Sequence, residues 1–153
     1  MKEIKLNRGL FALVDDEDYD FLNQFKWYAR KDKVTHYVER NKTNKDVGRE
    51  LKMSRLIMGA LINEEVDHAD SNGLNNQRYN LRKCNRSQNC ANRKRWGKNK
   101  YRGVYILKKY ITSYITVNNN QIYLGTFKTE IQAAKAYDEA AKKYFGEFAN
   151  LNF

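Results

Sequence analysis

The stretch Val66–Asn89, VDHADSNGLNNQRYNLRKCNRSQN, decides how we interpret the fold and the function of the chain. It contains one of only two histidines, placed directly after an acid in the pair Asp67-His68. The residues up to His68 indicate the end of a short strand, and Ser71-Asn72-Gly73 is typical of the turn that reverses a hairpin. We therefore expect a β-hairpin at this point.

A helix is expected next. The polar and basic residues from Leu81 onward suit a helix, whose main part we place from about Asn85 to Arg95. Asn85, Asn89 and Asn92 would share one of its faces. Strand, turn, irregular segment and helix would then bring four polar side chains within reach of one another: those of Asp67, His68, Asn80 and Asn89.

These four side chains suit hydrolysis around one hard cation. A carboxylate and an amide oxygen are ligands that Mg²⁺ or Mn²⁺ accepts, so Asp67 and Asn89 are the candidate metal ligands. His68 is the candidate base for the attacking water, and the Asn80 carbonyl would accept from its other ring nitrogen. Because adjacent strand residues point to opposite faces, Asp67 and His68 can cooperate only if the strand bends or bulges there.

Other interpretations of these residues stay open. A lone histidine can serve in packing, Asn80 can cap the turn into the helix, and Asn89 can be a solvated polar residue. A calcium loop is disfavoured, because the segment that begins at His68 would place Tyr79 where such loops carry glutamate.

Charge points to a polyanionic partner. The formal net charge is +11, and no acidic residue lies between Asp70 and Glu130. Asparagine, glutamine and tyrosine accompany the basic residues there, whereas a membrane-binding helix needs a strong apolar face. We therefore expect double-stranded DNA as the partner, with no membrane. The basic candidates for DNA contact are Arg82, Arg86, Arg93, Lys94, Arg95, Lys98, Lys100 and Arg102.

Composition excludes several classes of protein. The chain has 153 residues and 41% hydrophobic content, enough for modest cores in one to three small domains. It has no apolar run long enough for a membrane span, and its start does not resemble a signal peptide, so we expect a cytoplasmic protein. Cys84 and Cys90 lack a second pair nearby, which argues against a zinc site or a disulfide framework.

The N-terminal residues 1–50 are expected to form a β-rich module. The acids from Asp15 to Asp20 are explained by the start of a short helix that runs to Phe25. Ser54 is expected to cap another short helix, Arg55–Ala60. Alternating apolar residues predict strands at Glu3–Leu6, Leu10–Val14, Trp27–Arg30, Tyr37–Arg40 and Glu50–Met53.

Residues 101–153 are expected to form a three-stranded antiparallel sheet followed by a helix. The predicted strands are Arg102–Ile106, Ile111–Val117 and Ile122–Leu124. Thr129 and Gln132 form a capping box at the start of the helix, and Gly146 marks its end. Alternation places a set of side chains on the sheet face away from the helix, as candidates for DNA contact: Arg102, Tyr105, Tyr114, Thr116, Gln121 and Tyr123.

Asp67-His68, Asn80-Leu81 and Asn89 resemble the ββα-metal nuclease motif of HNH homing endonucleases, mobile-element enzymes common in bacteriophages. In that family the matching residues hold the roles given above. Arg55-Leu56-Ile57-Met58-Gly59 also resembles the family, except that Ser54 stands where a histidine usually precedes the arginine.

The C-terminal segment resembles the DNA-binding domain of plant ethylene-response (APETALA-type) factors. The resemblance rests on Tyr101-Arg102-Gly103-Val104, Tyr123-Leu124-Gly125-Thr126-Phe127 and Ala133-Ala134-Lys135-Ala136-Tyr137-Asp138. It implies that the outer face of the sheet reads bases. Arg102 keeps one of the family's arginines, but tyrosine, threonine and glutamine replace several others.

We therefore expect an α+β protein with an N-terminal module (1–50), an HNH nuclease motif (51–95), a basic linker (96–100) and an APETALA-type domain (101–153). The expected function is site-specific DNA cleavage by a metal-dependent endonuclease of the homing type. A monomer would nick one strand, and dimerisation on DNA is left open. The alternative is a DNA-binding or regulatory protein with a catalytically silent motif, which Ser54 favours. An RNA-binding protein also fits the charge but explains neither the hairpin nor the terminal sheet.

Overall fold

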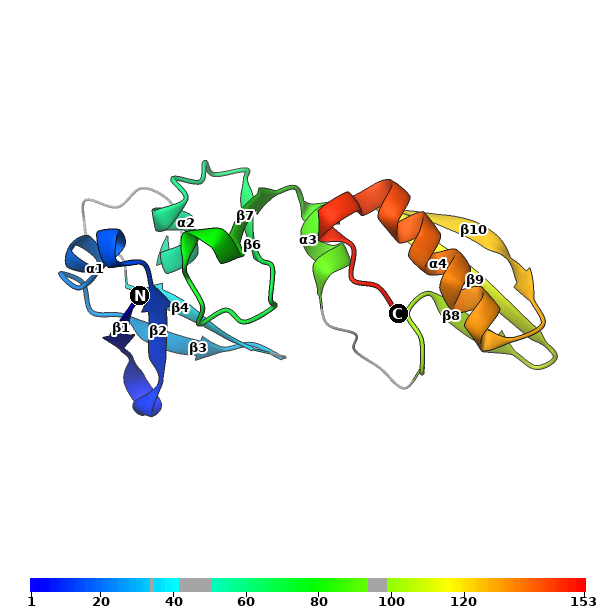
Figure 1. Ribbon diagram of the computed structural model, residues 1–153, viewed down its shortest axis with the longest axis horizontal. Helices are drawn as coiled ribbons and strands as arrows, with labels where there is room; N and C mark the ends of the chain where they lie inside the picture. Colours follow the sequence, from blue (N-terminus) through cyan, green and yellow to red (C-terminus); the bar gives the residue numbers. More distant parts are fainter. Residues whose placement is uncertain (34, 42–50, 94–98) are drawn as a thin grey trace. The chain divides into compact units, whose positions relative to one another are not determined.

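The computed structural model describes residues 1–33, 35–41, 51–93 and 99–153. The internal contacts divide the chain into two units, Met1–Asn85 and Arg86–Phe153 (Figure 1). This division falls inside the segment predicted to be the nuclease motif. Helices and several small antiparallel sheets confirm the α+β class. The predicted DNA contacts Lys94, Arg95 and Lys98 lie outside the described residues.

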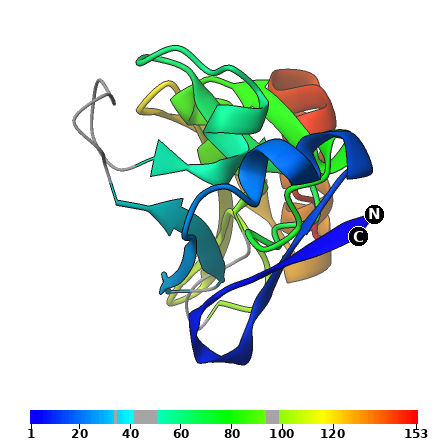
Figure 2. The same cartoon turned by 90° about the vertical axis from the view of Figure 1, so that its left-hand side faces the viewer.

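The first unit begins with a β-hairpin. Strand β1 (Lys2–Lys5) pairs with β2 (Phe11–Val14), and the connection contains the short helix η1 (Asn7–Gly9), blue in Figure 2. Helix α1 (Asp16–Leu22) follows and ends before the predicted Phe25. The hairpin and helix contribute apolar side chains to a common core, whose most deeply buried members include Val14, Leu22 and Met53.

A second sheet of this unit has the order β3-β4-β5, with β3 at Tyr28–Lys31, β4 at His36–Arg40 and β5 at Leu51–Lys52. Helix α2 (Met53–Ile57) comes directly after β5. The expected cap at Ser54 is wrong, because the N-cap position is Lys52 and Ser54 is buried within the helix at 4% exposure.

The predicted hairpin forms from β6 (Glu65–His68) and β7 (Leu81–Cys84). Two details of the sequence interpretation are wrong. Leu81–Cys84 is a strand and not the first turn of a helix, because its residues pair with β6. The chain reverses over a long loop, residues 69–80, which contains the short helix η2 (Arg78–Asn80) instead of a tight turn at Asn72-Gly73.

The second unit contains helix α3 (Arg86–Asn92) and the predicted three-stranded sheet, in the order β10-β9-β8. The strands are β8 (Val104–Leu107), β9 (Tyr110–Val117) and β10 (Asn120–Phe127). Two-residue turns join them, and Asn118 and Asn119 both adopt positive φ as the second turn requires.

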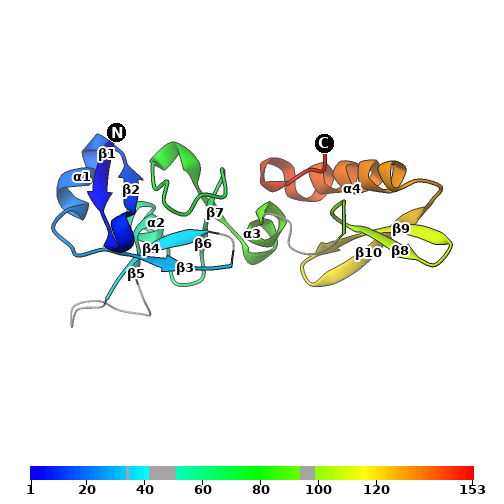
Figure 3. The same cartoon turned by 90° about the horizontal axis from the view of Figure 1, so that it is seen from below.

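Helix α4 (Glu130–Phe145) lies across one face of this sheet (Figure 3). The predicted capping box of Thr129 and Gln132 and the end at Gly146 are confirmed, and the short helix η3 (Gly146–Phe148) follows. Ala133 and Ala134 are completely buried against the sheet, since small side chains let the helix lie close. Among the described residues, no helix has both the length and the apolar character needed to cross a bilayer.

Candidate functional site

The paired strands β6 and β7 place an acid and a base side by side. Asp67 and Arg82 are partners in the antiparallel register, and Arg82 Nη2 lies 2.5 Å from Asp67 Oδ2. The side chains are only 6% and 16% exposed, so the ion pair is shielded from water. Arg82, which we expected to contact phosphate, thus neutralises the carboxylate that we expected to hold the metal.

His68 ends β6 and is 5% exposed. Its Nε2 lies 3.3 Å from Oδ1 of Asn76, and Asn76 Nδ2 donates to the carbonyl of Gly73. The second bond fixes the orientation of the amide, so that Oδ1 accepts from Nε2–H and the lone pair of the imidazole lies on Nδ1. Burial lowers the pKa of His68 below its ordinary value, which favours the neutral, proton-accepting ring.

Asn80 organises the loop before β7. It is 1% exposed, and its Nδ2 donates to Asp70 Oδ1 at 2.9 Å and to the carbonyl of Asn75 at 2.8 Å. Its Oδ1 accepts from the backbone N–H of Asp70. The backbone oxygen of Asn80 accepts from Ala69 N, and a ring nitrogen of His68 contacts Asn76. The expected bond between His68 and Asn80 stays a prediction.

The loop is held against strands of the same unit. Leu13 of β2 exchanges backbone hydrogen bonds with Leu74 and Asn76. Gly73 approaches β4 so closely that a Cβ atom there would lie 2.4 Å from the carbonyl oxygen of His36, so only glycine fits without a shift. These contacts place Asn76 beside His68.

A second set of contacts joins the loop to α1. Arg78 donates to both carboxylate oxygens of Asp18, at 2.9 and 2.7 Å, and its backbone N–H donates to Asp15. Asp15 stands at the N-cap position of α1 without a side-chain cap hydrogen bond, so the capping expected of this acidic cluster is wrong. Asp15 and Asp18 anchor the loop instead.

The side chains of Asp67 and His68 extend from adjacent positions of a regular strand. The register runs without a bulge from Glu65 to His68, so the bend or bulge that their cooperation requires is not present within the strand. The strand ends at His68, where the chain turns through a bond from Ser71 N to the His68 carbonyl. How the two side chains would act on one substrate stays a prediction.

Asn89, the second predicted metal ligand, lies in α3 and so belongs to the second unit. Its part in the site stays a prediction. Among the described residues, no three His, Cys, Asp or Glu side chains gather in a cluster. Asp67 and Asn89 offer hard oxygen donors, and Mg²⁺ commonly binds through one or two such ligands with water and phosphate in its other positions. The chemistry of each donor therefore fits Mg²⁺ or Mn²⁺, and their common site stays a prediction.

Three predicted DNA contacts form an aromatic row on the sheet of the second unit. The rings of Tyr105 and Tyr114 are 5.7 Å apart between centroids, and those of Tyr114 and Tyr123 are 5.3 Å apart. Thr116 and Gln121 are paired across β9 and β10, two residues further along, and both are exposed. The predicted common face of these five residues is confirmed.

Arg102 differs from the expectation. Its guanidinium donates to the carbonyls of Ala91 and Arg93 at the end of α3. The last carbonyls of a helix lack partners within the helix, so a nearby guanidinium stabilises them. The predicted contacts Arg86, Arg93 and Lys100 are exposed.

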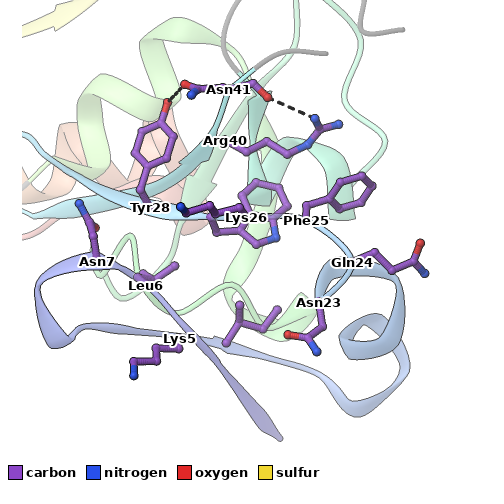
Figure 4. A pocket seen from close by; sticks show the side chains of 12 residues that line it. Lys5, Leu6, Asn7, Asn23, Gln24, Phe25, Lys26, Tyr28, Arg40 and Asn41 are labelled. Carbon is purple, nitrogen blue, oxygen red and sulfur yellow. Dashed lines mark hydrogen bonds between the residues drawn. The ribbon is translucent and has the colours of Figure 1, made fainter. Parts of the chain in front are cut away.

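The first unit also contains an open cavity of about 780 Å³ beside the β1–β2 connection (Figure 4). Aromatic, basic and amide side chains line it, among them Phe25, Tyr28 and Arg40. None of the sequence-predicted site residues lines this cavity. The buried acid-histidine pair therefore lies outside this cavity.

Sequence reasoning missed Asn76 and Asp70. Both lie in an irregular loop, where neither helical nor strand periodicity marks a buried side chain. The doublet Asn75-Asn76, between His68 and Asn80, was the feature of the sequence that could have indicated further buried hydrogen bonds in this loop, because buried amides need hydrogen-bond partners.

The chain is similar in sequence to two known proteins. No family model matches the chain. The chain is 30% identical over 151 residues to an uncharacterized HNH endonuclease of Acanthamoeba polyphaga mimivirus, a match that covers 95% of the chain and 76% of the relative. It is also 56% identical over 34 residues to dehydration-responsive element-binding protein 2A of Arabidopsis thaliana, which covers 22% of the chain and only 10% of that protein. The full-length similarity shows that the chain belongs to the HNH endonuclease family.

Proposed function

We propose that the protein is a site-specific, metal-dependent DNA endonuclease of the homing type that nicks one strand as a monomer. The observation that carries the proposal is the buried pair Asp67-His68, in which Asn76 holds Nε2 of the imidazole and leaves the lone pair on Nδ1. A neutral imidazole oriented in this way can accept a proton at Nδ1.

In the proposed reaction His68 Nδ1 takes a proton from water, and the water oxygen bonds to phosphorus. One P–O ester bond of the backbone breaks, and the leaving oxygen takes a proton from solvent. Asn76 keeps the ring in the required tautomer, and Asn80 holds the loop that presents Asn76. A magnesium or manganese ion held by Asp67 and Asn89 would supply stabilisation of the negative charge that develops on phosphate oxygen.

Arg82 has two roles in this account. Without a cation it neutralises Asp67. With a cation on the carboxylate, the guanidinium would be a candidate for the phosphate contact expected from the sequence. Arg86, Arg93 and Lys94 are further candidates for phosphate contacts, with Arg95, Lys98 and Lys100 in the segment that follows.

The proposal is tested by binding the protein to a randomised duplex library in EDTA, recovering the bound DNA, adding Mg²⁺ and sequencing any new ends. The account predicts new ends at a fixed offset from an enriched sequence. They should be absent for His68→Ala, which should bind the same sequence. An equal yield of ends from the variant would remove His68 from the reaction.

A second candidate function is a DNA-binding or regulatory protein with a silent nuclease motif. The observation that favours it is the ion pair of Asp67 with Arg82, which competes with a cation for the carboxylate. Enrichment of a sequence without new ends in either Mg²⁺ or Mn²⁺ would support this function against cleavage.

A further inference from the structure

The exposed face of the sheet in the second unit has an unusual composition for a DNA-reading surface. In the described residues 104–127, which form β8, β9 and β10, the only charged side chains are Lys108 and Lys109. Both lie in the turn between β8 and β9, where Leu107 pairs with Tyr110. The face itself therefore carries no arginine, lysine, aspartate or glutamate within these strands.

The side chains that do occupy this face are aromatic, aliphatic or uncharged polar. Tyr105, Tyr114 and Tyr123 form the aromatic row, and Tyr105 and Tyr123 are 42% and 55% exposed. By strand alternation Leu107 and Tyr110 extend the same face at one end, with 58% and 65% exposure. Helix α4 covers the opposite face.

Thr116 and Gln121 complete the face at the other end. They are direct cross-strand partners, so their side chains lie next to each other on one side of the sheet. The pair offers one methyl group and one amide at adjacent positions.

These groups match one class of base pair. Guanine is read most often by a bidentate arginine or lysine, which this face lacks, whereas glutamine pairs with the N6 and N7 atoms of adenine. The methyl group of threonine and aromatic carbon contact the 5-methyl group of thymine. We propose that the outer face of this sheet selects A·T base pairs, with Gln121 on adenine and Thr116 against the methyl group of a thymine.

The lysines of the unit complement this face without reading sequence. Lys108 and Lys109 are exposed at the end of the β8–β9 hairpin, and Lys128 is exposed directly after β10. All three stand outside the strands, where they can contact phosphates while the uncharged face meets the base edges. The inference rests on the proposed site-specific binding of duplex DNA.

Binding in EDTA tests the inference separately from cleavage. The sequence enriched from the randomised library is expected to contain a run of A·T pairs whose replacement by G·C weakens binding. Replacing its thymines one at a time by deoxyuridine, which lacks only the methyl group, should weaken binding about fourfold at one position, the effect of one buried methyl group. An enriched site made of G·C pairs, or no loss with deoxyuridine, would overturn the inference while leaving site-specific cleavage intact. Absence of any enriched sequence would defeat site-specific recognition itself and the inference with it.

A matched pair of variants assigns the contact. Thr116→Ser keeps the hydroxyl group and loses the methyl group, whereas Thr116→Val keeps a methyl group and loses the hydroxyl group. Thr116→Ser should bind the thymine and deoxyuridine sites equally, whereas Thr116→Val should keep the preference for thymine. Gln121→Ala should lose about tenfold in affinity at an A·T pair and little at a G·C pair at that position. The opposite pattern for the two Thr116 variants would refute the assignment, and circular dichroism checks that each variant is folded.

Discussion

Asn76→Ala tests how the hairpin prepares His68. Asn76 is 1% exposed, and its side chain makes two hydrogen bonds of 3.3 Å, one with His68 Nε2 and one with the carbonyl of Gly73. Each bond contributes about 1 kcal/mol, and a buried imidazole N–H left without its acceptor adds a similar cost, so we expect the variant to lose about 2–3 kcal/mol of stability.

The same substitution should also slow cleavage. Without Oδ1 of Asn76 the imidazole is free to adopt the other tautomer, which places the lone pair on Nε2 and away from the proposed proton acceptor. A positioned general base contributes about 10²- to 10⁴-fold to a rate, so its partial misorientation should lower the rate about 10- to 100-fold. We expect this loss in the single-turnover cleavage rate, with unchanged affinity for DNA in EDTA.

The stability of the first unit can be followed by the fluorescence of Trp27, 3% exposed in its core, in a Trp96→Phe background that leaves one tryptophan. Asn7→Ala is the matched control, because Asn7 accepts a hydrogen bond from Ala29 N in the same unit and has no part in the proposed chemistry. It should lose about 1 kcal/mol and cleave normally. A normal cleavage rate for Asn76→Ala, at a temperature where it is folded, would refute the role of Asn76.

Three further predictions follow from contacts in the two units. Arg82→Ala should lower the stability of the metal-free protein by about 3 kcal/mol, because it leaves the buried Asp67 carboxylate without its counter-charge. In thermal unfolding, Mg²⁺ should then stabilise the variant more than it stabilises the wild type. An equal shift of the two unfolding temperatures would argue against metal binding at Asp67. Burial raises the pKa of Asp70, but hydrogen bonds from Asn72, Asn75 and Asn80 outweigh it and hold the pKa below its ordinary value. Its stabilising contribution is therefore complete above the ordinary value and lost as pH falls through the lower, folded-state value. In acid titrations, the difference in stability between wild type and Asp70→Asn should shrink as pH falls from the ordinary pKa of aspartate to the lower pKa of Asp70 in the folded protein. A constant difference would show that these hydrogen bonds do not lower the pKa of Asp70. Thr129→Ala should cost the second unit about 1 kcal/mol by removing the capping box, whereas Thr129→Ser should retain most of the stability in thermal unfolding.

Local chemistry explains why much of the fold was predictable. The capping box of Thr129 and Gln132 and the positive-φ turn at Asn118-Asn119 need only residues close in sequence. The same is true of the alternation that places Tyr105, Tyr114 and Tyr123 on one face of a sheet.

Tertiary contacts decided the rest. The polar and basic composition of Leu81–Cys84 suits a helix, and only the pairing of this segment with β6 makes it a strand. Asn76 reaches His68 because the loop binds β2 through Leu13, and Arg102 turns toward the end of α3 because carbonyls there need donors. None of these partners is near in sequence to the residue it fixes.

The proposed nuclease function is tested most directly by single-turnover cleavage of the enriched duplex by wild type and His68→Ala, at protein concentrations that saturate binding for both. The account predicts Mg²⁺-dependent nicking of one strand by the wild type and no detectable cleavage by the variant, with equal affinity for the duplex in EDTA. Cleavage by the variant at the wild-type rate would show that His68 is not the base. Absence of cleavage by the wild type in both Mg²⁺ and Mn²⁺ would contradict the nuclease function itself.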